Sequence, residues 1–375
     1  MIATGLVGIA AVLLVGQLVT VGLYLVRLVR PPALPRHIGQ PGVTLLRPVC
    51  GLDTHDAETL GSSFRQDYPD YEVIFCAPSA ADPACALVRD LIAAHPDRQA
   101  RLLTGQISRS GNPKLDNVWK GWDAARHDYV CMSDSNLLLP PDYLSTLVAS
   151  WGPRTGMVSS PPIGIRPVGF GGALECAFLN CNQARLQFAA ASIGAGFAQG
   201  KTLLYHRPMV EAAGGLAELG RYLAEDVSST KLVRRLGRRV SLPPLPYAQP
   251  IGRRSVAQVW DRQLRWSRVR RDGFALIFVT EIANGAVLPG LALATALQLS
   301  GGSWLWLLAY LALWFGAEVV LMIRAGWPHG WRDIVALPLR DLLLPALWVT
   351  TFRRRGFEWR GTAMDTVEHR QEGPA

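Results

Sequence analysis

An uncharged run over residues 2–26 opens the chain and limits what it can fold into. About 20 apolar residues in a helix are enough to cross the hydrocarbon core of a bilayer. Arg27, Arg30 and Arg36 follow the run, whereas a cleaved signal peptide carries its basic residues before a shorter apolar core. We therefore predict an uncleaved anchor over residues 1–27, with the next residues in the cytoplasm, because basic residues gather on that side of a membrane.

Three more apolar stretches lie near the other end, at residues 274–299, 304–323 and 334–352. We interpret the first two as full spans. The third carries Arg340 and Asp341 at its middle, which costs a few kcal/mol in lipid, so we leave it open as paired, re-entrant or interfacial.

The number of spans also decides on which side of the membrane the end of the chain lies. Three full spans after a cytoplasmic domain would place Arg353–Arg355 outside, against the positive-inside rule. We predict membrane helices within residues 273–352, a basic and polar tail over 353–375, and a multi-pass protein of the cell inner membrane.

Between the apolar ends, short β-rich runs alternate with stretches of helical period, which is typical of a parallel α/β sheet. We predict an α/β domain over residues 43–272, joined to the anchor by a Pro-rich linker over 28–42. In such sheets ligands bind beyond the carboxyl ends of the strands. The strands are predicted at 43–46, 71–76, 101–103 and 129–132, and the helices at 58–66, 84–94 and 114–125.

The net charge of +9 raises the question of nucleic acid, but much of it borders apolar segments, at Arg268, Arg270, Arg271 and Arg353–Arg355. Basic clusters in such places favour anionic lipid headgroups, so we predict no nucleic-acid partner. The six cysteines lack metal-ligand spacing, and in a cytoplasmic domain we expect free thiols that are mostly buried.

Two carboxylates follow predicted strands. Asp82 comes after the strand that ends at residue 76, where it can hold a uracil or ribose edge, although Asp before Pro83 is also a good helix start. Asp134 follows the strand that ends at residue 132. A carboxylate there suits a hard divalent ion that bridges diphosphate oxygens, although Asp, Ser and Asn residues are also common in turns.

Two more polar features come later in the chain. Glu225 and Asp226 open a helical run, where paired acids commonly just complement the helix dipole. Arg262 and Arg265 are three residues apart on one face of a basic helical stretch, so they can converge on a diphosphate beside Trp266. The same stretch can also lie on lipid headgroups, and the two interpretations are compatible.

Taken in order, these features resemble the D, D, D, (Q/R)xxRW pattern of family 2-type glycosyltransferases. The words around them resemble ceramide glucosyltransferase and its bacterial relatives over about residues 43–270. The matching words are Leu46–Asp53, Gln66–Glu72, Asp82-Pro-Ala, Asn112-Pro-Lys114, Asp134-Ser135, Ala224-Glu-Asp226 and Arg262-Gln-Leu-Arg-Trp266.

The resemblance implies a GT-A (Rossmann-like) domain that transfers a hexose, with inversion, from a UDP-sugar to the hydroxyl of a membrane lipid. Ceramide is the leading acceptor and a hopanoid polyol the nearest alternative. The sugar stays open among glucose, galactose and glucuronic acid. Two other hypotheses are a processive polysaccharide synthase, whose channel usually needs more spanning helices, and a non-catalytic membrane scaffold.

The resemblance also implies roles for single residues on the donor side. Asp82 would bind the nucleotide, Lys114 would contact the donor, and Asp134 would hold Mg²⁺ or Mn²⁺ with the diphosphate. Asn136 stands where many relatives in the wider superfamily have a second aspartate, a departure that the ceramide enzymes share and that bears on metal affinity.

On the reaction side, the resemblance makes Asp226 the catalytic base. Arg262, Arg265 and Trp266 would close over the donor diphosphate. A second catalytic acid is not needed, because the diphosphate leaves as a metal-bound anion, unlike the leaving group of glycosidases with their two flanking carboxylates.

Overall fold

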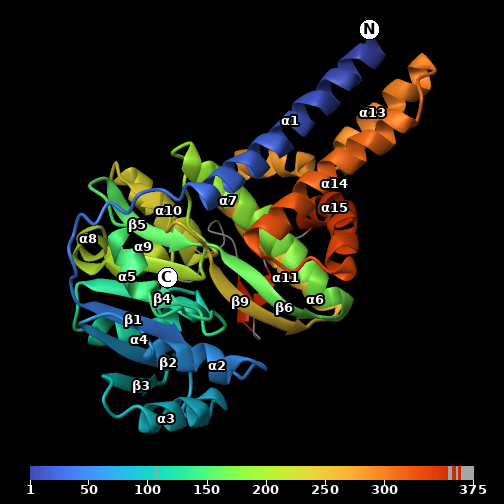
Figure 1. Ribbon diagram of the computed structural model, residues 1–375. Coiled ribbons are helices and arrows are strands. Elements are labelled where there is room, and N and C mark those ends of the chain that lie inside the picture. Colours follow the sequence, from blue (N-terminus) through green and yellow to red (C-terminus); the bar gives the residue numbers. More distant parts are fainter. Residues whose placement is uncertain (107, 354–356, 360–361, 365–375) are drawn as a thin grey trace. The chain divides into compact units, whose positions relative to one another are not determined.

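The computed structural model describes residues 1–106, 108–353, 357–359 and 362–364 (Figure 1). Arg354, Arg355 and most of the predicted tail lie outside the described residues. The chain divides into two compact units, which we describe one at a time. The sheet unit comprises Pro32–Ile163, Ala190–Pro250 and Gly356–Ala375, and the helical unit comprises Met1–Pro31, Gly164–Ala189 and Ile251–Arg355.

A mixed sheet of seven strands, in the order β3-β2-β1-β4-β7-β5-β8, organises the sheet unit. The first four strands in this order are parallel, whereas β7 is antiparallel to both β4 and β5, and β8 is parallel to β5. The strands are β1 (Val43–Pro48), β2 (Tyr71–Ala77), β3 (Ala100–Thr104), β4 (Tyr129–Ser133), β5 (Thr155–Ser160), β7 (Thr202–His206) and β8 (Arg239–Ser241).

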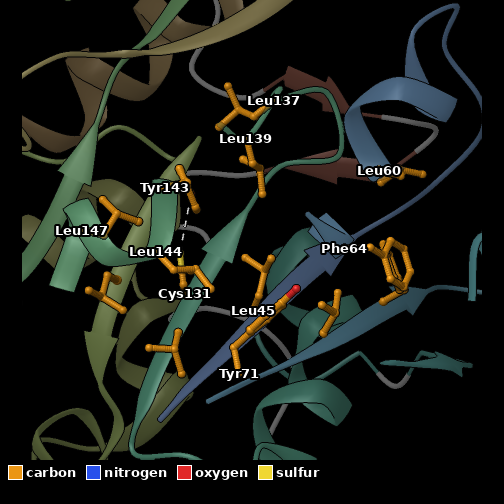
Figure 2. Packing of buried hydrophobic residues seen from close by; sticks show 14 of the residues in the cluster. Leu45, Leu60, Phe64, Tyr71, Cys131, Leu137, Leu139, Tyr143, Leu144 and Leu147 are labelled. Carbon is orange, nitrogen blue, oxygen red and sulfur yellow. Dashed lines mark hydrogen bonds between the residues drawn. The ribbon is translucent and has the colours of Figure 1, made fainter. Parts of the chain in front are cut away.

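Neighbouring residues on each strand point to opposite faces of the sheet. Both faces carry apolar side chains, and helices cover both of them. Leu45 and Cys131 belong to a core cluster that also includes residues of α3 and α5, and Figure 2 shows part of this packing. Leu46 and Met132 belong to a second cluster that includes residues of α4 and α10. The helices are α2 (Asp56–Gly61), α3 (Ala84–Ala94), α4 (Pro113–Ala124), α5 (Tyr143–Ala149), α8 (Arg207–Ala212), α9 (Gly215–Leu219) and α10 (Glu225–Arg235).

The α/β class predicted from the sequence is confirmed, and so are its first four strands and three helices. The bounds of the helix predicted over 58–66 differ from the structure. Helix α2 ends at Gly61, and a 3₁₀ turn, Ser62–Phe64, follows it. The parallel pattern stops at β4. Strand β7 reaches β4 after about 70 further residues and pairs with it in the antiparallel sense.

Buried Arg47 on β1 fixes the loop after β4. Its guanidinium donates to the Ser133 hydroxyl at 2.9 Å and to the carbonyls of Ser135 and Leu137 at 3.1 and 3.2 Å. Burial lowers the pKa of Arg47 to about 10, so the side chain stays charged near neutral pH. Hydrogen bonds from a buried cation therefore fix the loop that carries Asp134.

The helical unit is built mainly from long helices. Helix α1 packs against α13 and α14, with Ala10, Tyr310 and Trp314 in one cluster (Figure 1). A π-helix, Ala177–Ala184, joins α6 to α7. The helices are α1 (Ile2–Val29), α6 (Gly169–Cys176), α7 (Arg185–Ser192), α11 (Val256–Gly273), α12 (Ala275–Thr280), α13 (Val287–Ser300), α14 (Leu305–Ala325) and α15 (Trp331–Thr351).

Two further pairs of strands complete the described elements. Strands β6 (Pro162–Val168) and β9 (Tyr247–Arg253) form a two-stranded sheet, and the boundary between the units falls within each of them. Strands β10 (Phe357–Trp359) and β11 (Thr362–Met364) form an antiparallel hairpin.

Three helices of the helical unit, α1, α14 and α15, are long and apolar enough to cross a membrane. The predicted anchor and the predicted span over 304–323 agree with two of them. The predicted span over 274–299 is wrong as a single helix, because the chain bends by 47° between Ala275–Ala283 and Val287–Ser300. Gly285, at φ +148°, lies in the break, a conformation that only glycine adopts readily.

The third apolar stretch, left open above, is the continuous helix α15, and its charges are paired. Arg340 donates to Glu318 at 2.9 and 3.1 Å and to Asp341 at 2.6 Å. Gln17 donates to Glu318 at 3.0 Å, and Arg185 lies 3.7 Å from the same carboxylate. The network joins α1, α7, α14 and α15, so these charges avoid the large cost of facing lipid alone.

Candidate active site

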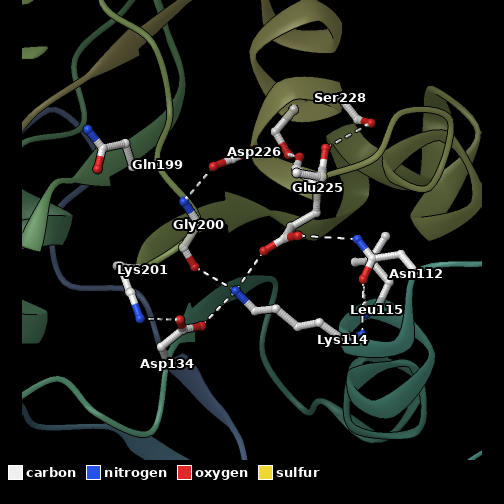
Figure 3. A network of polar contacts seen from close by, with 12 residues as sticks. Asn112, Lys114, Leu115, Asp134, Gln199, Gly200, Lys201, Glu225, Asp226 and Ser228 are labelled. Carbon is white, nitrogen blue, oxygen red and sulfur yellow. Dashed lines mark hydrogen bonds and ion pairs between the residues drawn. The ribbon is translucent and has the colours of Figure 1, made fainter. Parts of the chain in front are cut away.

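Lys114, in the first turn of α4, is the centre of a polar cluster in the sheet unit (Figure 3). Its ammonium lies 2.6 Å from a carboxylate oxygen of Asp134, 2.6 Å from one of Glu225 and 2.6 Å from the carbonyl of Gly200. The Asn112 side chain accepts from the Lys114 amide and so caps α4. This cap fixes the backbone position of Lys114 in the first turn. Lys114 and Asp134, which the sequence analysis predicted separately as site residues, are thus in direct contact.

Asp134 follows β4 directly and binds two lysines. Its backbone amide donates to the Lys201 carbonyl at 3.1 Å, and its second carboxylate oxygen lies 2.9 Å from the Lys201 ammonium. Burial works against ionisation of this carboxyl, but Lys114 and Lys201 outweigh burial and hold its pKa well below the usual range. Asp134 is therefore a permanent anion at neutral pH.

Glu225 and Asp226 open α10 and face two different partners. Glu225 is paired with Lys114 and also accepts from the Asn112 amide at 3.3 Å. Asp226 accepts from the Gly200 amide at 2.9 Å. Burial, together with the negative charge of Glu225, raises the pKa of Asp226 to about 7. A carboxylate with that pKa can take and release a proton near neutral pH, as a general base must.

Gly200 allows this close approach between α10 and the loop before β7. A Cβ atom at this position would lie 2.9 Å from a Glu225 carboxylate oxygen and 3.5 Å from both Asp226 and Lys114. The sequence predicted no role for Gly200 or Lys201, and for Glu225 only the helix-dipole role that it shares with Asp226. Glu225 could have been noticed from its position next to Asp226. Neither Gly200 nor Lys201 belongs to a recognisable motif, so the sequence does not indicate either of them.

Asp82 lies at the same edge of the sheet, after β2. Both of its carboxylate oxygens accept from the Gly51 amide at 2.9 Å, and one accepts from the Ala84 amide at 2.9 Å. Pro83 is the N-cap of α3, so the helix-cap role considered for Asp82 is wrong as stated, although its carboxylate does accept from the first amide of the helix. Its contact with a nucleotide stays a prediction.

Arg262, Arg265 and Trp266 lie on α11, in the helical unit. Arg262 donates to buried Glu175 at 2.7 Å, and Trp266 packs against a small cluster that includes Leu179. Their predicted closure over a donor diphosphate stays a prediction. The six cysteines are free thiols and all but Cys50 are buried, as expected.

The residues around Asp134 offer oxygen ligands to a divalent ion. Within the described ranges, no group of three or more His, Cys, Asp and Glu side chains is placed to hold a metal. Mg²⁺, however, usually needs only one or two carboxylates when substrate phosphates and waters complete its shell. The Lys201 ammonium lies 2.9 Å from an Asp134 oxygen and 2.9 Å from the Asn136 side-chain oxygen, so these two oxygens already share one cation. The donor set therefore fits a hard ion bound together with a diphosphate.

Comparison with known proteins gives a family, relatives and a fold. The family described as Glycosyl transferase family 21 matches residues 7–371. Ceramide glucosyltransferase 1 of Caenorhabditis elegans is 29% identical over 264 residues, which cover 70% of this chain and 57% of that protein. Ceramide glucosyltransferase 3 of the same organism is 24% identical over 330 residues, covering 85% of this chain and 72% of that protein. The match thus spans little more than half of the first of these relatives.

Among solved structures, the chain is similar to the mannosyltransferase PcManGT from Pyrobaculum calidifontis, determined in complex with GDP-Man and Mn²⁺. The identity is 22%, the TM-score is 0.56, and the match covers 90% of this chain and 99% of that one. A likeness at this identity shows the fold alone, which is GT-A.

Proposed function

The chain belongs to glycosyl transferase family 21, and from this premise we propose that it transfers a hexose, with inversion, from a UDP-sugar to the hydroxyl of a membrane lipid. Ceramide is the leading acceptor, because the relatives described above are ceramide glucosyltransferases, and their names favour glucose as the sugar. The observation that carries the proposal is the cluster of Lys114, Asp134, Glu225 and Asp226 beyond the strand ends.

Asp226 supplies the base for this reaction. Inverting transfer needs a carboxylate beside the acceptor hydroxyl, on the face of the sugar C1 opposite the leaving diphosphate. As the bond from the acceptor oxygen to C1 forms, the bond from C1 to the diphosphate breaks and the hydroxyl proton passes to Asp226. The pKa of about 7 suits this role, since about half of the Asp226 carboxyl groups are ionised at neutral pH and the group can also hold the proton.

Asp134 and Lys114 serve the leaving group. The diphosphate departs as an anion, so positive charge at its oxygens lowers the barrier. Mg²⁺ or Mn²⁺, held by Asp134 and Asn136, would supply part of that charge. In this proposal Asp82 contacts the nucleotide, and Arg262, Arg265 and Trp266 close over the diphosphate.

The membrane helices support a lipid acceptor. Helices α1, α14 and α15 are apolar enough to span, and a lipid can present its hydroxyl to the enzyme without leaving the bilayer. Arg27 and Arg30 follow the apolar part of α1, which supports a catalytic domain on the cytoplasmic side of the inner membrane. The described residues hold at most four candidate spans, fewer than a polysaccharide channel usually needs.

A direct assay tests the proposal. The full-length protein in lipid nanodiscs is incubated with UDP-glucose, UDP-galactose, UDP-glucuronic acid or GDP-mannose, and with ceramide or a hopanoid polyol, before mass spectrometry of the lipids. We expect a hexosyl ceramide from a UDP-sugar, and no product in excess chelator. The same assay with Asp226→Asn gives the background. A glycosylated hopanoid would correct the acceptor, a soluble polymer would overturn lipid transfer, and full turnover in chelator would remove the metal from the mechanism.

A further inference from the structure

Lys201 occupies the place at Asp134 where the proposed mechanism puts a divalent ion. It stands directly before β7, whose first residue, Thr202, pairs with Ser133 at the end of β4. The hydrogen bond from the Asp134 amide to the Lys201 carbonyl continues this ladder by one step. The antiparallel register therefore brings Lys201 opposite Asp134, and the contact does not depend on a flexible loop.

The contacts of the Lys201 ammonium resemble those of a bound ion. It lies 2.9 Å from an Asp134 carboxylate oxygen and 2.9 Å from the Asn136 amide oxygen. The side chain is only 14% exposed. Carboxylate and amide oxygens are also the ligands that hard divalent ions prefer. One positive charge of the protein itself thus already satisfies the oxygen pair.

An ammonium group and a divalent ion cannot occupy the same position between these two oxygens, and the charge of a divalent ion would add to the repulsion at such short range. Lys114 is held in place by Glu225 and by the Gly200 carbonyl as well as by Asp134. Lys201 has a flexible four-carbon stem, and a lysine ammonium is a common phosphate ligand. A donor that arrives with its ion brings the anionic oxygens to which the displaced ammonium can move.

We propose that Lys201 is an internal counter-cation: in the free protein it pairs with the Asp134 carboxylate and donates to the Asn136 side-chain oxygen, and it moves onto the donor diphosphate when nucleotide and divalent ion bind there. The inference rests on the proposed function for the identity of the donor. Two consequences follow. The free protein binds divalent ions weakly, and the ion and the nucleotide bind cooperatively, since each provides what the other needs.

Binding measurements on the full chain in nanodiscs test this inference without an activity assay. Free Mn²⁺ is followed by electron paramagnetic resonance, and UDP binding by isothermal titration. Without nucleotide, Lys201→Met should bind Mn²⁺ at least about tenfold more tightly than wild type, because the competing cation is gone. With Mn²⁺ present, the same variant should bind UDP about tenfold more weakly, because the phosphate contact is lost.

Two further variants control the test. Lys120→Met removes a lysine of α4 whose ammonium contacts Asn117 instead, and it should change neither affinity. Lys201→Gln has no charge but can still hydrogen-bond, and it should reproduce the tighter Mn²⁺ binding if Lys201→Met folds poorly, as judged by thermal melting.

The outcomes separate this inference from the proposed function. Mn²⁺ affinity that is unchanged or weaker in both Lys201 variants would overturn the inference and make Lys201 a structural ion pair. Failure to glycosylate any lipid would leave the Mn²⁺ comparison intact. A wild-type protein that binds UDP normally but never Mn²⁺ would overturn the displacement and the metal together.

Discussion

At the scale of single residues, Asp134 and Asp226 are carboxylates of one site with opposite electrostatic surroundings. Lys114 and Lys201 keep the pKa of Asp134 low, whereas burial and the neighbouring Glu225 raise that of Asp226. Surroundings that push the pKa values of two carboxyl groups apart give the groups different roles within one site. Asp134 can hold cations at every physiological pH, while Asp226 can exchange a proton.

The first prediction concerns the base. Asp226→Asn should lower transfer by about two to four orders of magnitude, the range for a lost general base, and should leave the affinity for UDP near normal. Transfer is measured by mass spectrometry and binding by isothermal titration. Glu225→Gln is the comparison, because it keeps Asp226 but weakens the hold on Lys114. If Asp226→Asn instead abolished UDP binding while single-turnover chemistry survived, Glu225 would become the better candidate for the base.

The second prediction concerns pH. Because the base must be ionised, kcat/KM should rise about tenfold per pH unit below 7 and level off above it. The group is identified by the variant: the residual activity of Asp226→Asn should lack this inflection. A profile that is flat from pH 5.5 to 8.5 in the wild type would contradict the raised pKa.

Proton linkage gives the same pKa a second readout. A carboxyl whose pKa is about 4 when unfolded and about 7 when folded binds more protons in the folded state. Its contribution to stability is fully present below about pH 4 and is lost as the pH rises through about 7. Asp226→Asn should therefore raise the melting temperature at pH 8 more than at pH 5.

At the scale of elements, the sequence predicted well what depends on neighbouring residues. Asn112-Pro113 is a strong helix start, and α4 begins at Pro113 with the Asn112 side chain as its cap. Helix α3 has the predicted bounds, 84–94. Strands β1, β2 and β4 are mostly apolar and almost entirely buried, as is typical of parallel strands under two helical layers.

The antiparallel strand β7 and the residues before it could not be predicted in this way. Lys201 contacts Asp134 through a register between segments nearly 70 residues apart, and no local pattern encodes such a pairing. Gly200 lies close to Glu225 and Asp226 only because α10 packs against it, so its sequence neighbours do not indicate these contacts. The predicted half of the site consists of motif residues, and the missed half consists of residues that the fold brings to them.

The third prediction tests that packing. Gly200→Ala places a methyl group 2.9 Å from a Glu225 carboxylate oxygen, so Glu225 must move away from Lys114. We expect transfer to fall at least about tenfold with little loss of thermal stability, since a carboxylate on a flexible stem can shift. Gly61→Ala is the matched control, because its methyl would meet its nearest neighbour, Leu91, at an ordinary 3.5 Å. Equal activity in the two variants would show that the close approach is not needed.

At the scale of the whole molecule, hydropathy located the apolar segments but not their form. The run over 274–299 is long enough to span a membrane, yet the helix is interrupted at Gly285. Next to this interruption, Asp341 accepts a hydrogen bond from the Ala286 amide at 2.8 Å. The charges of α15 marked that helix as unusual. Their partners Gln17, Arg185 and Glu318 could not be inferred, because they come from helices far apart in the chain.

This network underlies the last prediction. Arg340 is 2% exposed, and its partners Glu318 and Asp341 are 0% and 1% exposed. With Arg185 the group holds two positive and two negative charges, so it is neutral as a whole. Removing one member leaves an uncompensated buried charge, which costs about 3–5 kcal/mol. Arg340→Met should therefore lower the melting temperature strongly, as measured by thermal unfolding in detergent.

The double variant Arg340→Met with Asp341→Asn restores neutrality, because Arg185 and Glu318 remain as one pair. It should recover a substantial part of the lost stability, even though it removes one more native charge. Additive losses would mean that the hydrogen bonds themselves, such as the one from Ala286 to Asp341, matter more than charge balance. Recovery would instead show that the helices of this unit are joined through balanced charge, because the second substitution on α15 would offset the first.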